Sequence, residues 1–545
     1  MTHRAGRIAP ASTTNIQEYP LRRILHRLLQ SCIVTSLLLS ASSSALANNM
    51  TVSNATLTSP NSTSNTIKVQ FDISWQNSWR NATNRDAAWV FVKYSTDEGV
   101  TWSHATLKTA GTNPSDTSSG TGTSVNIIVP ADKKGAFIER SANGDGTTTL
   151  TEVQLTWDYG ADGLADNTIA RVKVFGLEMV YVPTAAYSAG DGSSTSSFQQ
   201  GSGDTDSWAV SGPGAISVTN TASNGYYDGG STYTIPAAFP EGYNAFYLMK
   251  YEITQGQYMD FLNTLSRAQQ INRVASTISA DTISNTYVMA NSSSYTNRSA
   301  IQAPSSGNGT TAPVVFNVTY SSNSKADRAC NYLSWMDGCA YADWAALRPI
   351  TELEYEKAAR GTSSDVNGEF AWGSTSITAA ATISGTENGT ETISTSSANA
   401  HYNNTTLSGG DGGTTGPLRA GIFATSSSTR SQSGAGYYGA MELSGNVRER
   451  CVTVGHATGR AFLGTHGDGV LTTETSYEGN ATNADWPGID GTTTRGVTGA
   501  TGSGSRGGDW SDSGSTTLRV SDRSVATTVD TTRTSDLGFR AGRSA

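Results

Sequence analysis

Cysteine side chains are the first candidates for chemistry in this sequence, because thiolates act as nucleophiles and as ligands for soft metal ions. The chain contains four cysteines, and Cys32 lies in an N-terminal apolar stretch apart from Cys330, Cys339 and Cys451. No CxxC pair and no cysteine–histidine grouping occurs, so a structural zinc site is not expected. Cys330 and Cys339 are expected either to form a disulfide or to be buried. Cys451 is a lone thiol, and most lone thiols are packing residues.

Histidines and common catalytic motifs give no further candidate for a reaction. After residue 47 the histidines are His104, His401, His456 and His466, and no HxxxH spacing occurs among them. The loop 158–163 looks like a calcium loop, but Ile169 stands at the twelfth position, where a bidentate Glu is needed, so a polar turn is expected. The sequence has no nucleophile elbow, phosphate-binding loop or dinucleotide-binding fingerprint.

The N-terminal segment has the form of a signal peptide. Three arginines between residues 22 and 27 precede an apolar stretch at residues 32–39, and Ala45-Leu46-Ala47 has the small-x-small pattern that signal peptidase recognises. This stretch is shorter than the ~20 residues that a membrane-spanning helix needs, and no other segment is long enough. We therefore expect residues 1–47 to be cleaved after Ala47 and the protein to be secreted or held in the cell envelope.

The composition excludes several classes of partner. The 545 residues carry 36 Lys and Arg against 45 Asp and Glu, a net charge of −9, and no run of basic residues follows the N-terminal segment. Nucleic acids and anionic membranes both require clustered basic residues, so neither is expected as a partner. Only 15% of the residues are charged and 57 are Gly, which suits long polar surface loops, while 11 Trp and 22 Tyr can build a folded core.

The elements that would position any site fall into two parts. Residues 48–172 contain several short strand-like runs separated by Gly-, Asn- and Ser-rich turns, and Thr66–Ile73 alternates apolar and polar residues. Several short strands in about 120 residues favour a β-sandwich of immunoglobulin-like type. From Gly176 onward, capping-box patterns and apolar periodicity predict short helices at 254–265, 334–344 and 351–361. The polar segments 266–325 and 374–398 are expected to be loop insertions.

The segments of the second part, taken in order, resemble the landmarks of the formylglycine-generating-enzyme (sulfatase-modifying factor) family. The matching segments are Gly176–Pro183, Tyr251–Asn263, Trp335–Trp344, Arg348–Gly361, Ala371–Gly373, Leu443–Glu449, Arg506–Trp510 and Leu537–Arg540. The resemblance implies an irregular, loop-rich domain over residues 173–545, related in shape to C-type lectins. The expected fold class of the whole chain is therefore α+β, with an immunoglobulin-like β-sandwich at 48–172 followed by this domain.

The resemblance implies copper chemistry that the sequence lacks. Working members of the family bind copper(I) through two cysteines close after a Gly-Gly-x-Trp/Tyr turn, and they use it with oxygen to oxidise a substrate cysteine to formylglycine. Copper(I) is a soft ion that thiolates hold best. The corresponding segment, residues 507–517, contains no cysteine, and Asp512 stands about where the first would be. Copper is therefore not expected. The histidine-bound iron of related sulfoxide synthases is not expected either.

The resemblance also implies two structural calcium sites, built from the carboxylate, amide and carbonyl oxygens that a hard cation prefers. The residues that match the first ion are Asn399, Ala400, Asp411 and Gly413. The residues that match the second ion are Glu442, Gly445, Val447 and Glu449. Arg448 stands where the family usually has Trp, which alters the packing at the second site. The alternative is that all of these are ordinary turn residues.

The leading hypothesis is a non-catalytic binding protein for an extracellular protein or glycan, with the fold used as a display scaffold. The family framework persists around residues 507–540, while the copper-binding thiols are missing. The residues expected to contact a ligand are Trp510, Ser511, Asp512, Ser513, Thr516 and Thr517. Similar C-terminal segments in this fold are the variable regions of proteins diversified by retroelements. The alternatives are an oxidoreductase that makes formylglycine through a non-standard site, and a structural envelope protein whose β domain is the working part.

Overall fold

The computed structural model describes residues 19–20, 50–191, 197–200, 206–219, 232–403, 407–411, 415–425 and 427–545. Contacts between Cα atoms divide the chain into two units: Met1–Trp79 with Ala88–Leu177, and Arg80–Ala87 with Glu178–Ala545. The expected signal peptide lies outside the described residues except for the pair 19–20, and Gly413 also lies outside them. Within the described ranges, no helix is both long and apolar enough to cross a membrane.

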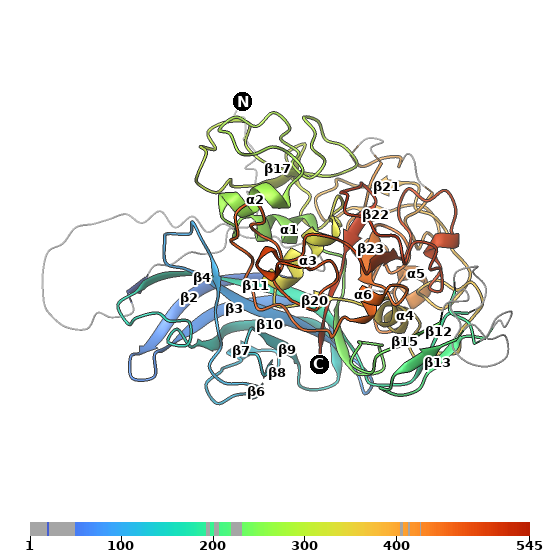
Figure 1. Ribbon diagram of the computed structural model, residues 1–545, viewed down its shortest axis with the longest axis horizontal. Helices are drawn as coiled ribbons and strands as arrows, with labels where there is room; N and C mark the ends of the chain where they lie inside the picture. Colours follow the sequence, from blue (N-terminus) through green and yellow to red (C-terminus); the bar gives the residue numbers. More distant parts are fainter. Residues whose placement is uncertain are drawn as a thin grey trace, which may run out of the picture. The chain divides into compact units, whose positions relative to one another are not determined.

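The first unit is built from β-strands (Figure 1, blue to cyan). One sheet has the order β2 (Thr51–Asn61), β3 (Thr66–Arg80), β10 (Gly144–Trp157) and β7 (Thr121–Gly122). A second run of strands has the order β11 (Ile169–Val182), β4 (Asp86–Ser95), β9 (Ala136–Arg140), β8 (Val125–Val129) and β6 (Gly111–Thr112). The short strand β5 (Ser103–His104) pairs with β4, and β1 (Tyr19–Pro20) pairs with β11.

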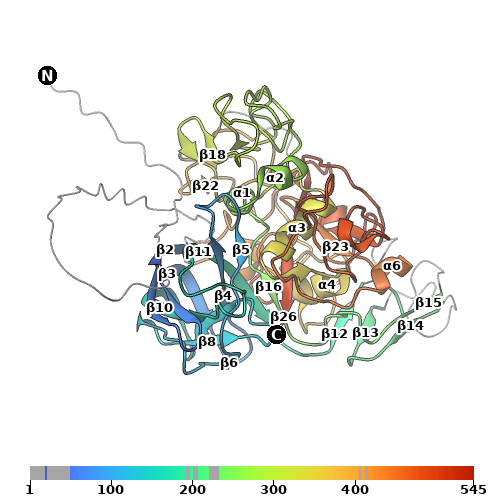
Figure 2. The ribbon, with the colours of Figure 1, turned by 60° about the vertical axis from the view of Figure 1, so that its left-hand side comes forward.

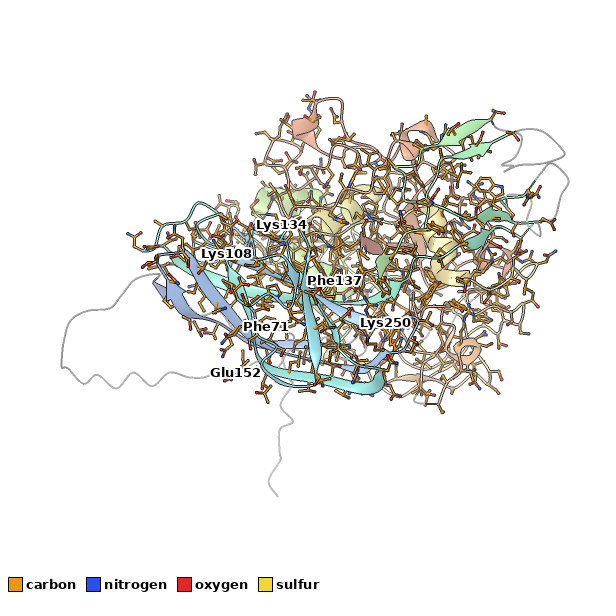
Figure 3. The ribbon with its side chains drawn as sticks, turned by 90° about the horizontal axis from the view of Figure 1, so that it is seen from below. Phe71, Lys108, Lys134, Phe137, Glu152 and Lys250 are labelled. Atoms are coloured by element: carbon orange, nitrogen blue, oxygen red, sulfur yellow. The ribbon has the colours of Figure 1, made fainter. Side chains whose placement is uncertain are left out.

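A hydrophobic core in this unit contains side chains from both sets of strands. Along β3, Phe71, Ile73 and Trp75 are buried while the residues between them are half-buried, as the alternation in the sequence predicts. Figure 3 labels Phe71 of β3 and Phe137 of β9, both of them buried. It also labels Lys108, whose ammonium group lies 2.9 Å from Asp158. The loop that contains Asp158 therefore makes an ordinary surface ion pair.

The strand order does not confirm the immunoglobulin-like topology. In an immunoglobulin-type sandwich the last strand lies in the same sheet as the strand before it. Here β11 lies beside β4, whereas β10 lies between β3 and β7 in the other sheet. The unit is therefore described as β-rich with two sets of strands, and the whole chain as α+β.

The second unit contains the helices, each of them short. They are α1 (Gln255–Leu262), α2 (Arg267–Arg273), α3 (Trp335–Trp344), α4 (Glu352–Arg360), α5 (Arg430–Ser433) and α6 (Ala457–Arg460), with 3-10 turns η1 (Thr493–Arg495) and η2 (Thr516–Leu518). Helices α1 to α5 each begin with a capping box, in which a Ser or Thr side chain and the N3 side chain bond each other's backbone N–H. The three helices predicted from sequence are thus confirmed, and Gly361 ends α4 with φ 70°.

The expectation that residues 266–325 and 374–398 are simple loop insertions is wrong in part. The first insertion begins with α2, which is capped by Ser266 and Gln269. It continues with β17 (Ile301–Gln302), β18 (Asn317–Tyr320) and β19 (Asn323–Ser324), and the second insertion contains the pair β21 (Ile383–Ser384) and β22 (Thr392–Ile393). Because each element is two to seven residues long, its pattern was too short to stand out from a polar loop.

Short sheets connect distant parts of the second unit. The end of β11 pairs with β16 (Phe246–Met249), which pairs with β26 (Ala541–Ser544) and through it with β20 (Arg348–Pro349). The hairpins β12–β13 (Tyr187–Ala189, Trp208–Val210) and β14–β15 (Ile216–Val218, Tyr233–Ile235) lie near one another in Figures 1 and 2. A third sheet places β23 (Arg448–Val452) between β24 (Ser503–Arg506) and β25 (Leu537–Phe539).

Buried ion pairs hold these elements together. Five arginines of the second unit are almost fully buried, and helix α4 supplies most of their acidic partners. The pairs are Arg348 with Glu354, Arg360 with Glu356 and Glu369, Arg506 with Glu352 and Glu356, Arg523 with Glu352, and Arg540 with Glu449. The guanidinium groups other than that of Arg523 also bond backbone carbonyls, which helps to make a charge tolerable in the interior.

Candidate functional site

The Gly507–Gly508 turn follows β24 and is fixed by close packing. The two glycines have φ values of 92° and 64°, in the left-handed region that favours glycine. A Cβ on Gly508 would lie 2.6 Å from a methyl group of Leu518, so a larger residue would force a shift. Gly507 accepts the N–H of Gly445 through its carbonyl at 2.8 Å. The turn is therefore anchored to the residues of the second predicted calcium set.

Arg448, the first residue of β23, lies between two carboxylates that follow this turn. Its guanidinium is 2.7 Å from Oδ2 of Asp509 and 2.8 Å from Oδ1 of Asp512. The other oxygen of Asp512 accepts from the Thr517 hydroxyl at 2.7 Å and from the N–H of Asp509 at 3.0 Å. The residue that stands about where the family has its first copper-binding cysteine is thus part of an ion-pair network.

Burial and opposite charges shift the pKa values of this network in opposing directions. Burial raises the pKa of the Asp509 carboxyl to about 6, against the opposing attraction of Arg448. Burial alone would lower the pKa of Arg448, but Asp509 and Asp512 outweigh it and hold that pKa above its usual range. Both carboxylates are paired with the same guanidinium, at 2.7 and 2.8 Å.

The residues predicted to contact a ligand divide into buried and exposed groups. Trp510 is only 6% exposed, packs against Ala329 and Val447, and donates its indole N–H to the Ser535 carbonyl at 3.0 Å. Asp512 and Thr517 are half-buried and bond to each other. Ser511, Ser513 and Thr516 are exposed. The indole therefore anchors the segment, and the exposed residues form its outer face.

The cysteines are inside the second unit and apart from this turn. Cys330, Cys339 and Cys451 are all free and buried, so the disulfide alternative is not realised and the buried alternative holds. Burial raises the pKa of each thiol well above its usual range. Cys451 lies on β23 with no exposed surface. A buried protonated thiol is neither a nucleophile nor a good copper ligand.

The second predicted calcium set contains two carboxylates with free oxygens. Glu442 and Glu449 are 6% and 1% exposed, and Oε2 of each is buried without a hydrogen-bond partner. Their Oε1 atoms bond the N–H of Gly421 and the guanidinium of Arg540. Burial raises the pKa of Glu442 to about 7 against Arg540, and nearby Glu252 is raised well above its usual range by burial and by these two carboxylates. A buried excess of negative charge of this kind fits a calcium ion.

Calcium at this set would be held by Glu442 and Glu449 together with the carbonyls of Gly445 and Val447, and it would supply structural charge neutralisation. Among the residues described, no group of three or more His, Cys, Asp and Glu side chains could hold a metal ion. A set of two carboxylates and two main-chain carbonyls has fewer than three such side chains, so this finding does not bear on it.

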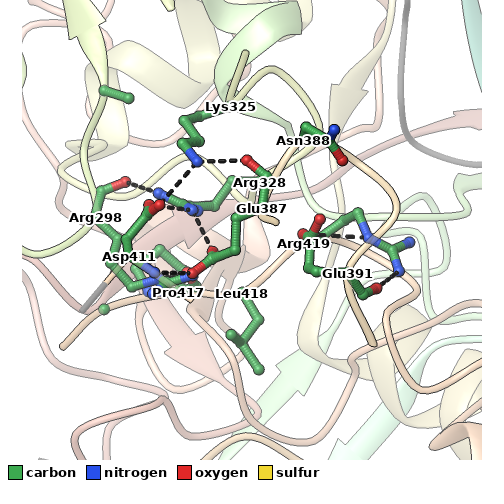
Figure 4. A network of polar contacts seen from close by, with 12 residues as sticks. Arg298, Lys325, Arg328, Glu387, Asn388, Glu391, Asp411, Pro417, Leu418 and Arg419 are labelled. Atoms are coloured by element: carbon green, nitrogen blue, oxygen red, sulfur yellow. Dashed lines mark hydrogen bonds and ion pairs between the residues drawn. The ribbon is translucent and has the colours of Figure 1, made fainter. Parts of the chain in front are cut away.

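The first predicted calcium set is placed differently. Asn399 and Ala400 line a small pocket together with Glu442, Ser444 and Asn446. Asp411 instead belongs to the polar network of Figure 4, in contact with Lys325 and Arg328. Asn399 of the first calcium set therefore lies beside Glu442 of the second set. Asp411 of the first set lies beside Lys325 and Arg328 instead.

The second unit is a loop-rich α+β domain. After its Gly507–Gly508 turn, carboxylates paired with Arg448 stand where a pair of cysteines would be expected. A family profile described as "Sulfatase-modifying factor enzyme 1-like domain" matches residues 209–545. The match spans more than half of the chain, and the chain belongs to this family. Seven of the eight segments read from the sequence as family landmarks lie within the matched residues, and Gly176–Pro183 lies before them.

A comparison with solved structures finds a match to variable protein 1 of Treponema denticola. It is 12% identical, covers 68% of this chain and 96% of its own chain, and has a TM-score of 0.28. A score that low supports no statement about ligand or activity. A comparison with curated proteins finds no match.

Two functional contacts could not be found by reading motifs. The partners of Arg448 are Asp509 and Asp512, which lie 61 and 64 residues further along the chain. No local sequence pattern identifies them as its partners. The only sequence signal was the departure of Arg448 from the family's Trp. Glu252 was also missed, because a Glu before a helix cap is usually exposed, whereas here it bonds Asn446 and Val447 and is fully buried.

Proposed function

We propose that this protein is an exported, non-catalytic binding protein in which residues 507–540 present the ligand surface. The ligand class is an extracellular protein or glycan. The single observation that carries the proposal is the Arg448 ion pair with Asp509 and Asp512, at 2.7 and 2.8 Å. It fixes the segment that carries copper ligands in working relatives, and it does so with groups that cannot replace them.

The outer face of this segment supports a binding role. Ser511, Ser513 and Thr516 are exposed, small and polar, while Trp510 and Leu518 beneath them are buried. A fixed backbone with small exposed side chains can accept many substitutions without unfolding, because surface changes of this kind alter stability little. That is the requirement for a display surface, including one diversified by a retroelement.

The state of the cysteines supports the absence of copper oxidation. No cysteine occurs in residues 507–517, and Cys330, Cys339 and Cys451 are buried with raised pKa values. Copper-dependent oxygen uptake with a cysteine-containing peptide is the measurement that would rescue the enzyme alternative. No turnover by copper-loaded protein, with calcium present, is the expected result.

Calcium and export complete the proposal. The free oxygens of Glu442 and Glu449 support one structural calcium ion at the second predicted set. The arginines, apolar stretch and Ala45-Leu46-Ala47 pattern support cleavage after Ala47. N-terminal sequencing of protein recovered from the periplasm or medium of an expressing bacterium should give Asn48 as the first residue, and recovery only of uncleaved cytoplasmic chain would contradict export.

The binding role is tested on glycan and peptide arrays with the full mature chain. Wild type is compared with Ser511→Tyr and Thr516→Tyr, which place bulk on the proposed face, and with Ser427→Tyr, a matched change at an exposed serine elsewhere in the second unit. The first two variants should lose array binding and the third should retain it. Equal binding by all three would place the ligand elsewhere. A neighbouring reverse-transcriptase gene with a template repeat would support diversification.

A further inference from the structure

Asp411 is held by protein cations on both of its oxygens. Lys325 donates to Oδ1 at 2.9 Å, and Arg328 donates to Oδ2 at 3.1 Å. The hydroxyl of Tyr295 donates to Oδ2 at 2.9 Å. The side chains of Lys325 and Arg328 are 1% and 3% exposed, so these are interior ion pairs rather than surface contacts (Figure 4). Both oxygens of this carboxylate are therefore engaged by protein donors, two of which are cations.

The other described oxygens of the first predicted calcium set are also engaged. Oδ1 of Asn399 accepts the N–H of Thr378 at 2.9 Å. The carbonyl of Ala400 accepts the N–H of Ala380 at 2.9 Å. These bonds belong to the pairing of segment 378–380 with segment 399–400. A calcium ion would have to compete with backbone hydrogen bonds as well as with two cations.

The buried network around Asp411 contains more cations than carboxylates. Glu387 pairs with Arg298 and with Arg328, the latter at 2.6 Å, and its main-chain carbonyl accepts from Lys325. Three cations therefore face two carboxylates in a buried network (Figure 4). A dication placed here would meet a net positive surrounding with little water to screen it, which makes its entry unfavourable.

We propose that Lys325 and Arg328 replace the calcium ion of the first family site, so that this site binds no calcium and Asp411 serves as a partner of protein cations. The network joins Lys325, the last residue of the first insertion, and nearby Arg328 to Glu387 of the second insertion and to Asp411. Its role is the role that calcium has in such loops: it pins polar segments that lack a large core of their own. This inference is independent of the ligand surface proposed above.

The decisive experiment counts calcium on the full mature chain. Equilibrium dialysis with radioactive calcium is compared for wild type, Asp411→Asn and Glu442→Gln. Asp411→Asn should bind as many calcium equivalents as wild type while its Tm falls, because two cations lose their partner. Loss of one equivalent in Asp411→Asn would overturn the inference. If only Glu442→Gln loses calcium, the ion is at the second site and the first site holds none. If no protein binds calcium, the first site again holds none, and the separate proposal for Glu442 is wrong.

A second, milder variant covers the case in which Asp411→Asn does not fold. Terbium(III) takes calcium sites and emits when a nearby tyrosine transfers energy to it, and Tyr295 bonds Asp411 directly. Terbium emission from wild type and Tyr295→Phe should be equal within error, because no ion is bound beside Tyr295. A clear drop of emission in Tyr295→Phe, with the same Tm as wild type, would show an ion at Asp411 and would overturn the inference.

Discussion

Glu352, in the first turn of α4, lies 2.6 Å from the guanidinium of Arg523, and the two side chains are 0% and 3% exposed. The same carboxylate accepts from Arg506, from the Thr453 hydroxyl and from the N–H of Val454. A carboxylate with this many partners can be buried because its lone pairs are all used. It ties the α4 block to the C-terminal strands, so it is the natural place to test what holds the second unit together.

Arg523→Met should destabilise the protein by about 3–5 kcal/mol, because Glu352 would lose a buried partner. Urea denaturation of the full chain measures the change. The matched control is Arg495→Met, which breaks a pair with Glu474 at 3.6 Å between side chains that are 38% and 34% exposed. The control should change stability by less than about 1 kcal/mol. Equal losses of stability in the two variants would show that the buried pair of Glu352 and Arg523 contributes no more than an exposed pair.

The Arg448 network should control the order of the proposed ligand segment. Arg448→Met leaves Asp509 and Asp512 without their cation, so the segment should loosen. Hydrogen exchange is the measurement: the amides of Asp509 and Asn403, which bond Asp512, should lose protection by about tenfold or more. Ser513→Ala at an exposed position should leave both amides unchanged. Unchanged protection in Arg448→Met would mean that packing alone holds the turn.

Calcium should raise the Tm of the wild type through Glu442 and Glu449. Chelation with EDTA should lower the Tm by a few degrees, since a bound ion stabilises only the folded state. Glu442→Gln should abolish the difference between calcium and EDTA, and Glu474→Gln, a change at a partly exposed carboxylate elsewhere, should preserve it. An identical melt of the wild type with and without calcium would remove the proposed second site.

Stability should depend on pH through Asp343 of α3. This carboxylate is fully buried and accepts the N–H groups of Asp468, Gly469 and Thr482, and burial raises its pKa to about 7 from 3.8. A raised folded pKa means that folding favours the protonated acid. Its stabilising effect is therefore full below pH ~4 and is lost as the pH rises towards 7, by on the order of 4 kcal/mol.

The measurement is the free energy of unfolding between pH 4 and 8 for the wild type and for Asp343→Asn. The slope over this range should be smaller in the variant, even where its stability is lower throughout. Asp485→Asn, a change at a carboxylate in a surface loop, should leave the slope as in the wild type. A variant with the full slope would show that other carboxyl groups carry the pH dependence.

The three cysteines of the second unit should be unreactive in the folded state. Cys330, Cys339 and Cys451 are free and buried, and burial raises the pKa of each thiol. Ellman's reagent should label none of them under native conditions and all three in guanidinium chloride. Rapid labelling of one thiol in the native protein, or fewer than three after denaturation without reductant, would contradict this arrangement.

Elements whose signals are local could be predicted from the sequence. The Thr254–Gln257 and Thr351–Glu354 capping boxes locate α1 and α4, and the alternation around Phe71 locates β3. Helix α2 has a Ser266–Gln269 box of the same kind and was within reach of the same rule. It was missed because the polar composition of the insertion outweighed a seven-residue pattern.

Relationships between distant residues could not be predicted in this way. The place of β10 beside β3 depends on packing of the whole unit, so strand patterns gave the right elements and not their order. Lys325 and Asp411 are 86 residues apart, and no spacing rule links them. The family resemblance identified Asp411 from its neighbours in sequence, whereas its cationic partners are Lys325 and Arg328, more than 80 residues earlier in the chain.

Residues 80–87 have a consequence for how this protein can be divided. They belong to the second unit although Ala88–Leu177 of the first unit follow them in the chain. Arg85 accepts the N–H of Tyr181 at 2.9 Å, and Asn84 donates to the Tyr438 carbonyl at 3.0 Å. A gene fragment that begins after the β-rich unit therefore encodes an incomplete second unit. Recombination that exchanges domains by a single crossover would break it, so the two units should be inherited together.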